Sequence, residues 1–197
     1  FYGFMKDFSG FDNKHNPVID IPTDTSRVAV LDGQQRLTSL NIGLRGSYAY
    51  KTKNAWSSKA SSFPVRKLYL NLLGEAPEND AGLRYDLRFL TLEQVKDAEG
   101  DFSKVWFPVS EIFDAAEQFQ FIQLPAKYGV GNDGGAVEML GRLWQAVHSN
   151  ESLRFYEEDD QDIERVLDIF VRVNRPLILR PADVNRYRPV EDKRCSS

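Results

Sequence analysis

The sequence predicts an α+β fold, in which a small mixed β-sheet packs against helices. Short segments that are β-branched, or that alternate between apolar and polar residues, recur along the chain as strands require. Other segments carry apolar residues at three- and four-residue spacing, which is typical of amphipathic helices. With 197 residues and 42% hydrophobic side chains, the chain can build a sizeable core. We therefore expect a single domain over residues 1–185 and a polar tail or linker over residues 186–197.

The expected strands are short and either β-branched or alternating: residues 1–5, 27–31, 65–72, 84–90, 105–109 and 153–156. Residues 27–31 are compact and apolar, which predicts a buried strand. Residues 65–72 and 84–90 lie on either side of a turn and alternate in polarity, so they predict a hairpin. The polar, lysine-bearing stretch at 47–62 predicts a loop.

Three expected helices have apolar residues at helical spacing: residues 34–44, 136–148 and 163–173. Two further helices are expected from their caps, one that starts within residues 91–94 and one that begins at Glu111. Gly46 is a suitable stop for the first helix. Thr91 and Ser110 are suitable amino-terminal caps for two others. The glycine-rich stretch 129–135 predicts a flexible connection.

Charge and cysteine content narrow the class of protein. The net charge is −4 and the isoelectric point is about 5.3, so a basic surface over the whole chain is absent and DNA contact would need a local patch. Cys195 is the single cysteine, which excludes an intrachain disulfide and favours a cytoplasmic location. No apolar run approaches the roughly 18 residues of a membrane span, so we expect no membrane association.

Chemistry-bearing residues gather in the turn Asp32-Gly33-Gln34-Gln35-Arg36, at the start of the first expected helix. Gly33 permits a tight turn and lets a ligand approach the backbone. The first helical amides have no partner within the helix, and with the helix dipole they favour an anion. The Arg36 guanidinium can form two parallel hydrogen bonds with a phosphate. The side-chain amides of Gln34 and Gln35 can orient a ribose, a base edge or a water molecule.

Taken alone, this turn has a second interpretation. Asp32 can hold a magnesium ion or accept a proton, but it can also cap the helix that follows. In that case the segment is an ordinary strand, turn and helix without a ligand. The local sequence therefore indicates an anion at a helix start, and it does not identify which anion binds there.

The residues from Asp32 to Leu40 resemble the signature of the amino-terminal domain of GmrSD-type restriction endonucleases, a member of the ParB/sulfiredoxin-like superfamily. Later segments resemble further parts of this family in the same order: residues 67–71, 88–91, 106–112 and 169–174. The first match is specific, and the later ones add weight because they follow in order along most of the chain.

The resemblance implies a ParB/sulfiredoxin-like fold and a module that binds or hydrolyses nucleoside triphosphates and reports on DNA modification in antiphage defence. The residues that it assigns to nucleotide binding are Gly33, Gln34, Gln35, Arg36, Thr38, Arg172 and Asn174. Asp32 and Arg36 are the expected catalytic residues. Arg36 would stabilise phosphate charge, and Asp32 would position a water molecule or ligate Mg²⁺, the expected metal cofactor.

The chain departs from the family pattern in two places. The family carries a Gln-Arg-aromatic element upstream of the first strand, and none precedes Phe1. We therefore expect a fragment that lacks its upstream start. The family also follows its Arg-x-Asn block with a Ser/Gly-Gly turn, whereas Asn174 is followed by Arg175-Pro176.

Other candidate sites have simpler explanations. His15 and His148 are too few and too far apart to indicate a metal site, and His148 at a helix end is expected to be either structural or solvent-exposed. Redox chemistry of the sulfiredoxin type needs a cysteine at the phosphate turn, and this turn has none. Trp106 and Trp144 fit a hydrophobic core. Trp56 lies in the lysine-bearing loop, which is the best local candidate for contact with DNA.

The favoured function is binding and hydrolysis of a nucleoside triphosphate, coupled to the sensing of modified DNA in a prokaryotic restriction system. The expected partners are DNA and a separate HNH-type nuclease domain or subunit, and a homo-oligomer is a further candidate assembly. A first alternative is a non-catalytic module whose turn grips a DNA phosphate and positions the nuclease. A second alternative is an interaction domain that keeps the turn for structure alone.

Overall fold

The structure, a computed structural model, describes residues 2–20, 28–76, 84–151, 153, 155, 157, 158 and 162–174. It groups the chain into two units, Phe1–Arg154 and Phe155–Ser197. The α+β prediction is confirmed, because five strands in the described residues form a mixed sheet against which helices pack. The single domain over residues 1–185 stays a prediction, and the expected tail over 186–197 lies outside the described residues.

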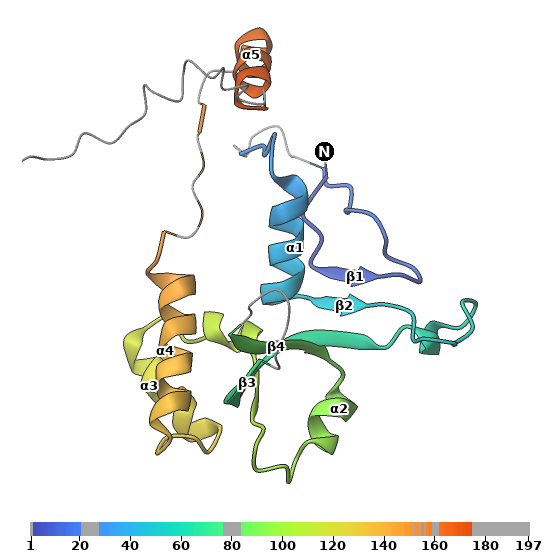
Figure 1. Ribbon diagram of the computed structural model, residues 1–197. Helices are drawn as coiled ribbons and strands as arrows, with labels where there is room; N and C mark the ends of the chain where they lie inside the picture. The colour runs from blue at the N-terminus through green and yellow to red at the C-terminus, as the bar shows by residue number, and fades with distance from the viewer. Residues whose placement is uncertain are drawn as a thin grey trace, which may run out of the picture. The chain divides into compact units, whose positions relative to one another are not determined.

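The sheet is organised around one long strand, β3 (Val65–Glu75). Strands β4 (Tyr85–Leu90) and β5 (Trp106–Pro108) both run antiparallel to β3, so the predicted hairpin is confirmed. Strand β2 (Ser47–Ala49) pairs with the beginning of β3, and β1 (Asp7–Ser9) runs parallel to β2. This last pair makes the sheet mixed, and Figure 1 shows β1 and β2 lying side by side near the end of α1.

The core lies where β3 and β5 meet the helices of the carboxyl-terminal half of the first unit. These are the 3₁₀ helix η2 (Val109–Phe113), α3 (Gln118–Lys127) and α4 (Gly134–His148). The buried apolar side chains of this core are Leu70, Leu72, Phe107, Val109, Ile112, Ala115, Leu124, Val130, Ala136 and Leu140. Figure 1 shows α3 and α4 packed together beside the sheet. Burial of these side chains is the main source of stability for the unit.

Helix α4 is fixed to the core by polar contacts as well as by its apolar stripe. The Asp133 carboxylate accepts a hydrogen bond from the Ala136 amide at 2.8 Å and caps the helix. The Trp144 indole donates to the carbonyl of Ala115 at 2.7 Å, and the His148 imidazole lies 2.8 Å from the carbonyl of Ile112. Of the two alternatives expected for His148, the structural role is therefore confirmed.

Helix α1 (Gln34–Arg45) confirms the helix predicted over residues 34–44. The Asn41 side chain donates to the carbonyl of Met5 at 3.0 Å, which ties the helix to the amino-terminal segment. At the helix end, Gly46 passes so close to Lys6 that a Cβ atom would lie 1.7 Å from the Lys6 carbonyl oxygen. The Ser47 amide donates to that same oxygen at 3.3 Å. These contacts place β1 beside β2.

Helix α2 (Leu92–Asp97) begins at the predicted cap, Thr91. The Thr91 hydroxyl accepts from the Gln94 amide at 3.2 Å, and the Gln94 side chain accepts from the Thr91 amide at 3.0 Å. This reciprocal pair is a capping box. We expect Thr91→Ala to lower the free energy of unfolding by about 1 kcal/mol, measured by chemical denaturation. Thr91→Ser keeps the acceptor and should lose less than half of that amount; an equal loss in both variants would contradict the capping role.

Three predicted strands are wrong in their described parts. Residues 28–31 form no strand, and Val28 and Leu31 are 75% and 54% exposed. Tyr2 makes only an isolated bridge, and the described residues of 153–156 are irregular. β-branched composition favours an extended backbone, but a strand forms only where a neighbour offers its hydrogen bonds. In the described part of the chain, none of the sheet strands β1 to β5 pairs with these residues. Arg27 lies outside the described residues.

The segment predicted as a loop at 47–62 begins with β2 and ends in a short 3₁₀ helix, η1 (Ala60–Ser62). The helix predicted from Glu111 is instead the 3₁₀ helix η2, whose cap position is Pro108 rather than Ser110. Helix α3 was not predicted, because Pro125 lies inside it. The glycine-rich stretch is a tight turn that leads into the first turn of α4, and not a flexible connection.

The second unit contributes one described helix, α5 (Ile163–Asn174), which confirms the helix predicted over residues 163–173. Its first turn is supported by the Asp162 carboxylate, which accepts from the Glu164 amide at 3.0 Å. Among the described residues of both units, no helix combines the length and the apolar composition needed to cross a membrane.

Candidate phosphate site at the start of α1

The start of α1 is shaped by Gly33, which occupies the cap position with a φ of 76°. This left-handed conformation favours glycine over residues with a side chain. The first helical hydrogen bond runs from the Leu37 amide to the Gly33 carbonyl at 3.0 Å. The amides of the three residues between them therefore have no intrahelical partner, and no described side chain caps them. The helix presents three unsatisfied donors at its positive end.

Asp32 does not cap this helix. Its Oδ1 accepts a hydrogen bond from the Gly33 amide at 2.6 Å, which fixes the carboxylate outside the first turn. Its Oδ2 lies 3.9 Å from the Arg36 guanidinium, with the side chains of Asp32 and Arg36 51% and 82% exposed. An exposed pair at this distance contributes roughly 0–1 kcal/mol, so a phosphate can displace it at small cost. Asp32 and Arg36 thus lie together beside the free amides.

The side chains of Gln34 and Gln35 differ in whether they are free to contact a ligand. The Gln34 side chain donates to the carbonyl of Val30 at 2.7 Å, which fixes the segment leading into the turn. The Gln35 side chain is exposed, while its backbone carbonyl accepts from the Ser39 hydroxyl at 2.9 Å. Thr38 is half-buried, one turn further along. Of the two predicted glutamines, Gln35 is the one whose side chain is open to a ligand.

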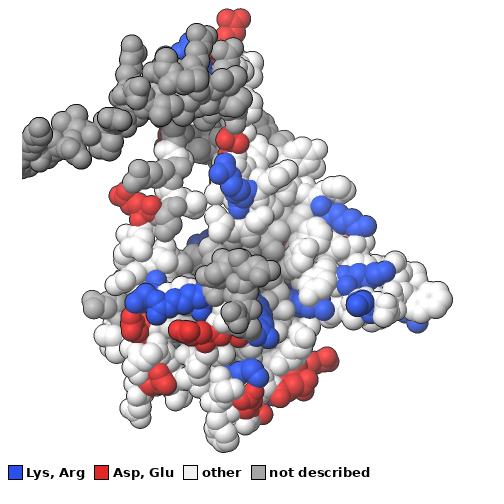
Figure 2. All heavy atoms as spheres, viewed as in Figure 1, with Lys and Arg blue, Asp and Glu red and all other residues white. Residues whose placement is uncertain are grey.

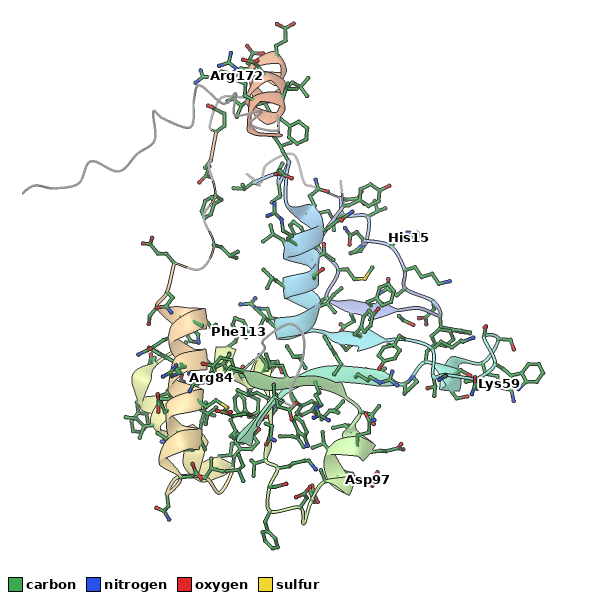
Figure 3. The ribbon with its side chains drawn as sticks, in the orientation of Figure 1. His15, Lys59, Arg84, Asp97, Phe113 and Arg172 are labelled. Atoms are coloured by element: carbon green, nitrogen blue, oxygen red, sulfur yellow. The ribbon has the colours of Figure 1, made fainter. Side chains whose placement is uncertain are left out.

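The second predicted block lies on α5, in the second unit. The Arg172 guanidinium forms an ion pair of 2.6 Å with Asp168, one turn earlier on the helix, and its side chain is 74% exposed (Figure 3). Asn174 is the last residue of α5, and its side chain lies outside the described part of the chain. The expectation that Arg172 and Asn174 line the same pocket as Arg36 stays a prediction.

Comparison with known proteins identifies the family. The model of the GmrSD restriction endonuclease N-terminal domain matches residues 13–184. The chain belongs to this family. The matched range contains the Asp32–Arg36 turn and α5, while no curated protein gives a match. Membership implies a role in restriction and antiphage defence, interaction with DNA and a nuclease partner domain.

Two cavities in the described part of this GmrSD-family domain lie away from the Asp32–Arg36 turn, which lines neither of them. The larger, of about 770 Å³, lies between the connection from α2 to β5 and the turn before α4, with Phe102, Tyr128 and Asp133 in its lining. The smaller, of about 230 Å³, includes Arg84 and Arg142. Sequence reasoning gave no indication of either cavity, since their linings come from segments distant along the chain.

Two titratable groups that line the larger cavity are held in one protonation state. Hydrogen bonds from Lys104 and Ser103 lower the pKa of Asp101 to about 2, so this carboxylate stays ionised. Burial, together with a hydrogen bond to Glu111, raises the pKa of the Tyr128 hydroxyl, so this group stays protonated. Neither group therefore titrates in the physiological range, where general acid–base catalysis requires a group that does.

Proposed function

We propose that this domain binds a nucleoside triphosphate at the start of α1 and hydrolyses it, and that this activity is coupled to the sensing of modified DNA. The observation that carries the proposal is the set of unsatisfied amides after Gly33, with the Arg36 guanidinium beside them, in a chain of the GmrSD family. Such a helix start binds phosphate through its amides and its dipole. Arg36 supplies the countercharge that a triphosphate needs.

Each residue of the turn has a role in this proposal. The amides of Gln34, Gln35 and Arg36 hold phosphate oxygens, and the absence of a Cβ at Gly33 lets the ligand approach. The Arg36 guanidinium stabilises charge that develops on the phosphoryl group during transfer. The exposed side chain of Gln35 orients the nucleoside or the attacking water. Gln34 keeps the turn in shape through Val30.

Asp32 fits a magnesium ligand in this arrangement. One of its oxygens is committed to the Gly33 amide, and the other faces the phosphate position beside Arg36. Proteins often hold Mg²⁺ with one or two carboxylates while substrate phosphates and water supply the remaining ligands. The described residues contain no cluster of three or more His, Cys, Asp or Glu that could bind a metal without such a ligand. Bound Mg²⁺ would neutralise phosphate charge, so metal binding should require nucleotide.

A DNA backbone phosphate is the second candidate ligand for the same turn. The observation that favours it is the high exposure of Arg36, which a large ligand can reach without a pocket. In that case the domain would position a nuclease without turnover of nucleotide. We further propose that the nuclease partner is of the HNH type, on a separate domain or subunit.

Substitution of Arg36 tests the proposed function. We expect Arg36→Ala to weaken binding of labelled nucleoside triphosphate by roughly tenfold to a hundredfold, since a charge-assisted contact to phosphate is lost. Arg45→Ala is the matched control, because it removes the same charge from the other end of α1, where Arg45 lies over the Phe113 ring at 4.4 Å. It should bind nucleotide as the unmodified chain does.

The same variants separate the two candidates. Loss of nucleotide binding and turnover in Arg36→Ala, with unfolding unchanged, supports the nucleotide site. Loss of DNA binding alone supports the DNA-phosphate candidate. If the unmodified chain binds none of the four common ribonucleoside triphosphates in the presence of Mg²⁺, the proposed function is wrong.

A further inference from the structure

Positive charge is concentrated in one segment of this acidic chain. Between Asp32 and Glu75 the sequence contains seven Lys or Arg residues and no Asp or Glu. Because the whole chain has a net charge of −4, the remaining residues carry a net charge of −11. Segregation on this scale creates a local positive field on an acidic protein, and such a field attracts polyanions.

One exposed part of this segment is the connection between β2 and β3, residues 50–64, here called the basic lobe. Lys51, Lys53 and Lys59 are all exposed on it, and among the described residues no carboxylate pairs with them. Figure 3 places Lys59 near the outer end of the lobe, away from the sheet. In Figure 2 several basic side chains and no acidic ones are visible at this end of the surface.

The basic lobe is held in shape at its base. Arg66 is only 8% exposed, and its guanidinium donates to the carbonyls of Tyr50 and Pro64 at 3.2 and 3.0 Å. The same guanidinium lies 3.9 Å above the Tyr50 ring. Further out, the Thr52 amide donates to the carbonyl of Ser62 at 2.8 Å. These contacts join the two ends of the connection, so its lysines project from an organised backbone.

Trp56 lies on the basic lobe with 75% of its surface exposed. The other two tryptophans are placed differently, because Trp106 is buried and Trp144 packs against the core. Exposure of an indole leaves a large apolar area in water, which protein folding ordinarily removes. An exposed indole among unpaired lysines is the combination that binds single-stranded nucleic acid, since the bases stack on the ring and the lysines follow the phosphates.

We propose that the basic lobe binds DNA, with Lys51, Lys53 and Lys59 on backbone phosphates and Trp56 stacked on an unpaired base. Lysine is a point charge without preference for a base, so the phosphate contacts would be independent of sequence. Stacking needs a base outside the duplex stack, so the lobe should prefer single-stranded or locally unpaired DNA to a continuous duplex. This inference is independent of the proposed nucleotide site, because none of its residues belongs to the Asp32–Arg36 turn.

Fluorescence anisotropy with labelled oligonucleotides tests the lobe. Trp56→Ala should weaken binding of a single strand by roughly fivefold to a hundredfold, the usual range for one stacked base, and should affect a continuous duplex less. Phe102→Ala is the matched control, because Phe102 is 96% exposed and lies on a different segment. That control should bind both oligonucleotides as the unmodified chain does.

Charge is tested by replacing Lys51, Lys53 and Lys59 together with glutamine. The plot of log binding constant against log salt concentration has a negative slope, and for the single strand this variant should reduce the magnitude of that slope by about 2. A control with the same change of net charge replaces Lys96, Lys127 and Arg142, which lie on α2, α3 and α4.

Each outcome decides the inference. DNA binding by the basic lobe is supported if the unmodified chain binds the single strand more tightly than the duplex, and if only the lobe variants lose this binding. The proposal is overturned if the control variants lose as much DNA affinity as the lobe variants, if both lobe variants keep the affinity of the unmodified chain, or if the unmodified chain binds no DNA. Arg36→Ala should retain DNA binding, and its failure to do so would assign the DNA site to the start of α1.

Discussion

Gly46→Ala is expected to lower the free energy of unfolding of the first unit by about 3 kcal/mol or more, which is at the upper end for single substitutions. The added Cβ would lie 1.7 Å from the carbonyl oxygen of Lys6 and 2.6 Å from its carbonyl carbon. Both are backbone atoms, so the strain cannot be relieved by rotation of a side chain. The amino-terminal segment would have to separate from the end of α1, and the pairing of β1 with β2 would be lost. Chemical denaturation followed by circular dichroism measures the effect.

Gly43→Ala is the matched control for this effect. Gly43 lies within α1, three residues earlier, and a Cβ there would meet only the Leu68 side chain, at 3.9 Å. Alanine is favoured over glycine inside a helix by up to about 1 kcal/mol, so this variant should be as stable as the unmodified chain or more stable. Similar stabilities for the two variants would show that the close approach of Lys6 and Gly46 does not hold β1 in place.

Phe107→Ala is expected to lower the free energy of unfolding by about 3–5 kcal/mol, the range for truncation of a large buried aromatic side chain. Phe107 is fully buried on β5, and its ring meets Tyr128 edge to face at 5.1 Å. Truncation would leave a cavity where β3 and β5 pack against the helices. Phe119→Ala is the control, because Phe119 is 70% exposed on α3 and its loss should change stability by less than about 0.5 kcal/mol. A loss below about 1 kcal/mol for Phe107→Ala would contradict this description of the core.

The regular elements that sequence predicted correctly are those with a strong local pattern. Residues 65–72 and 84–90 alternate in polarity over a full strand, and α4 and α5 have wide apolar stripes. Residues 28–31 have strand-like composition but remain irregular, because a strand depends on a neighbour that composition does not reveal. β1 and β2 were missed for the converse reason. They are three-residue strands in polar surroundings, fixed by contacts such as that between Lys6 and Gly46.

The sequence identified the residues of the candidate phosphate site, but it did not predict all of their contacts. A glycine directly before a helix start predicts a tight turn at Gly33 and free amides in the first turn of the helix. The hydrogen bond of Asp32 to the Gly33 amide, which stops Asp32 from capping the helix, depends on backbone geometry that sequence does not encode locally. The same holds for the two cavities, whose linings combine distant segments. The role of the lysines on the basic lobe depends on their common exposure, which the fold determines.

The most direct test of the proposed nucleotide site follows backbone amides by nuclear magnetic resonance while Mg²⁺ and a nucleoside triphosphate are added to the isotopically labelled chain. We predict saturable shifts of the Gln34, Gln35 and Arg36 amides with the triphosphate and none with the corresponding nucleoside, because the phosphates occupy the start of α1. A triphosphate site at the start of α1 is contradicted if these amides stay unchanged while the triphosphate binds elsewhere, for example in the cavity beside Phe102, or if no amide responds.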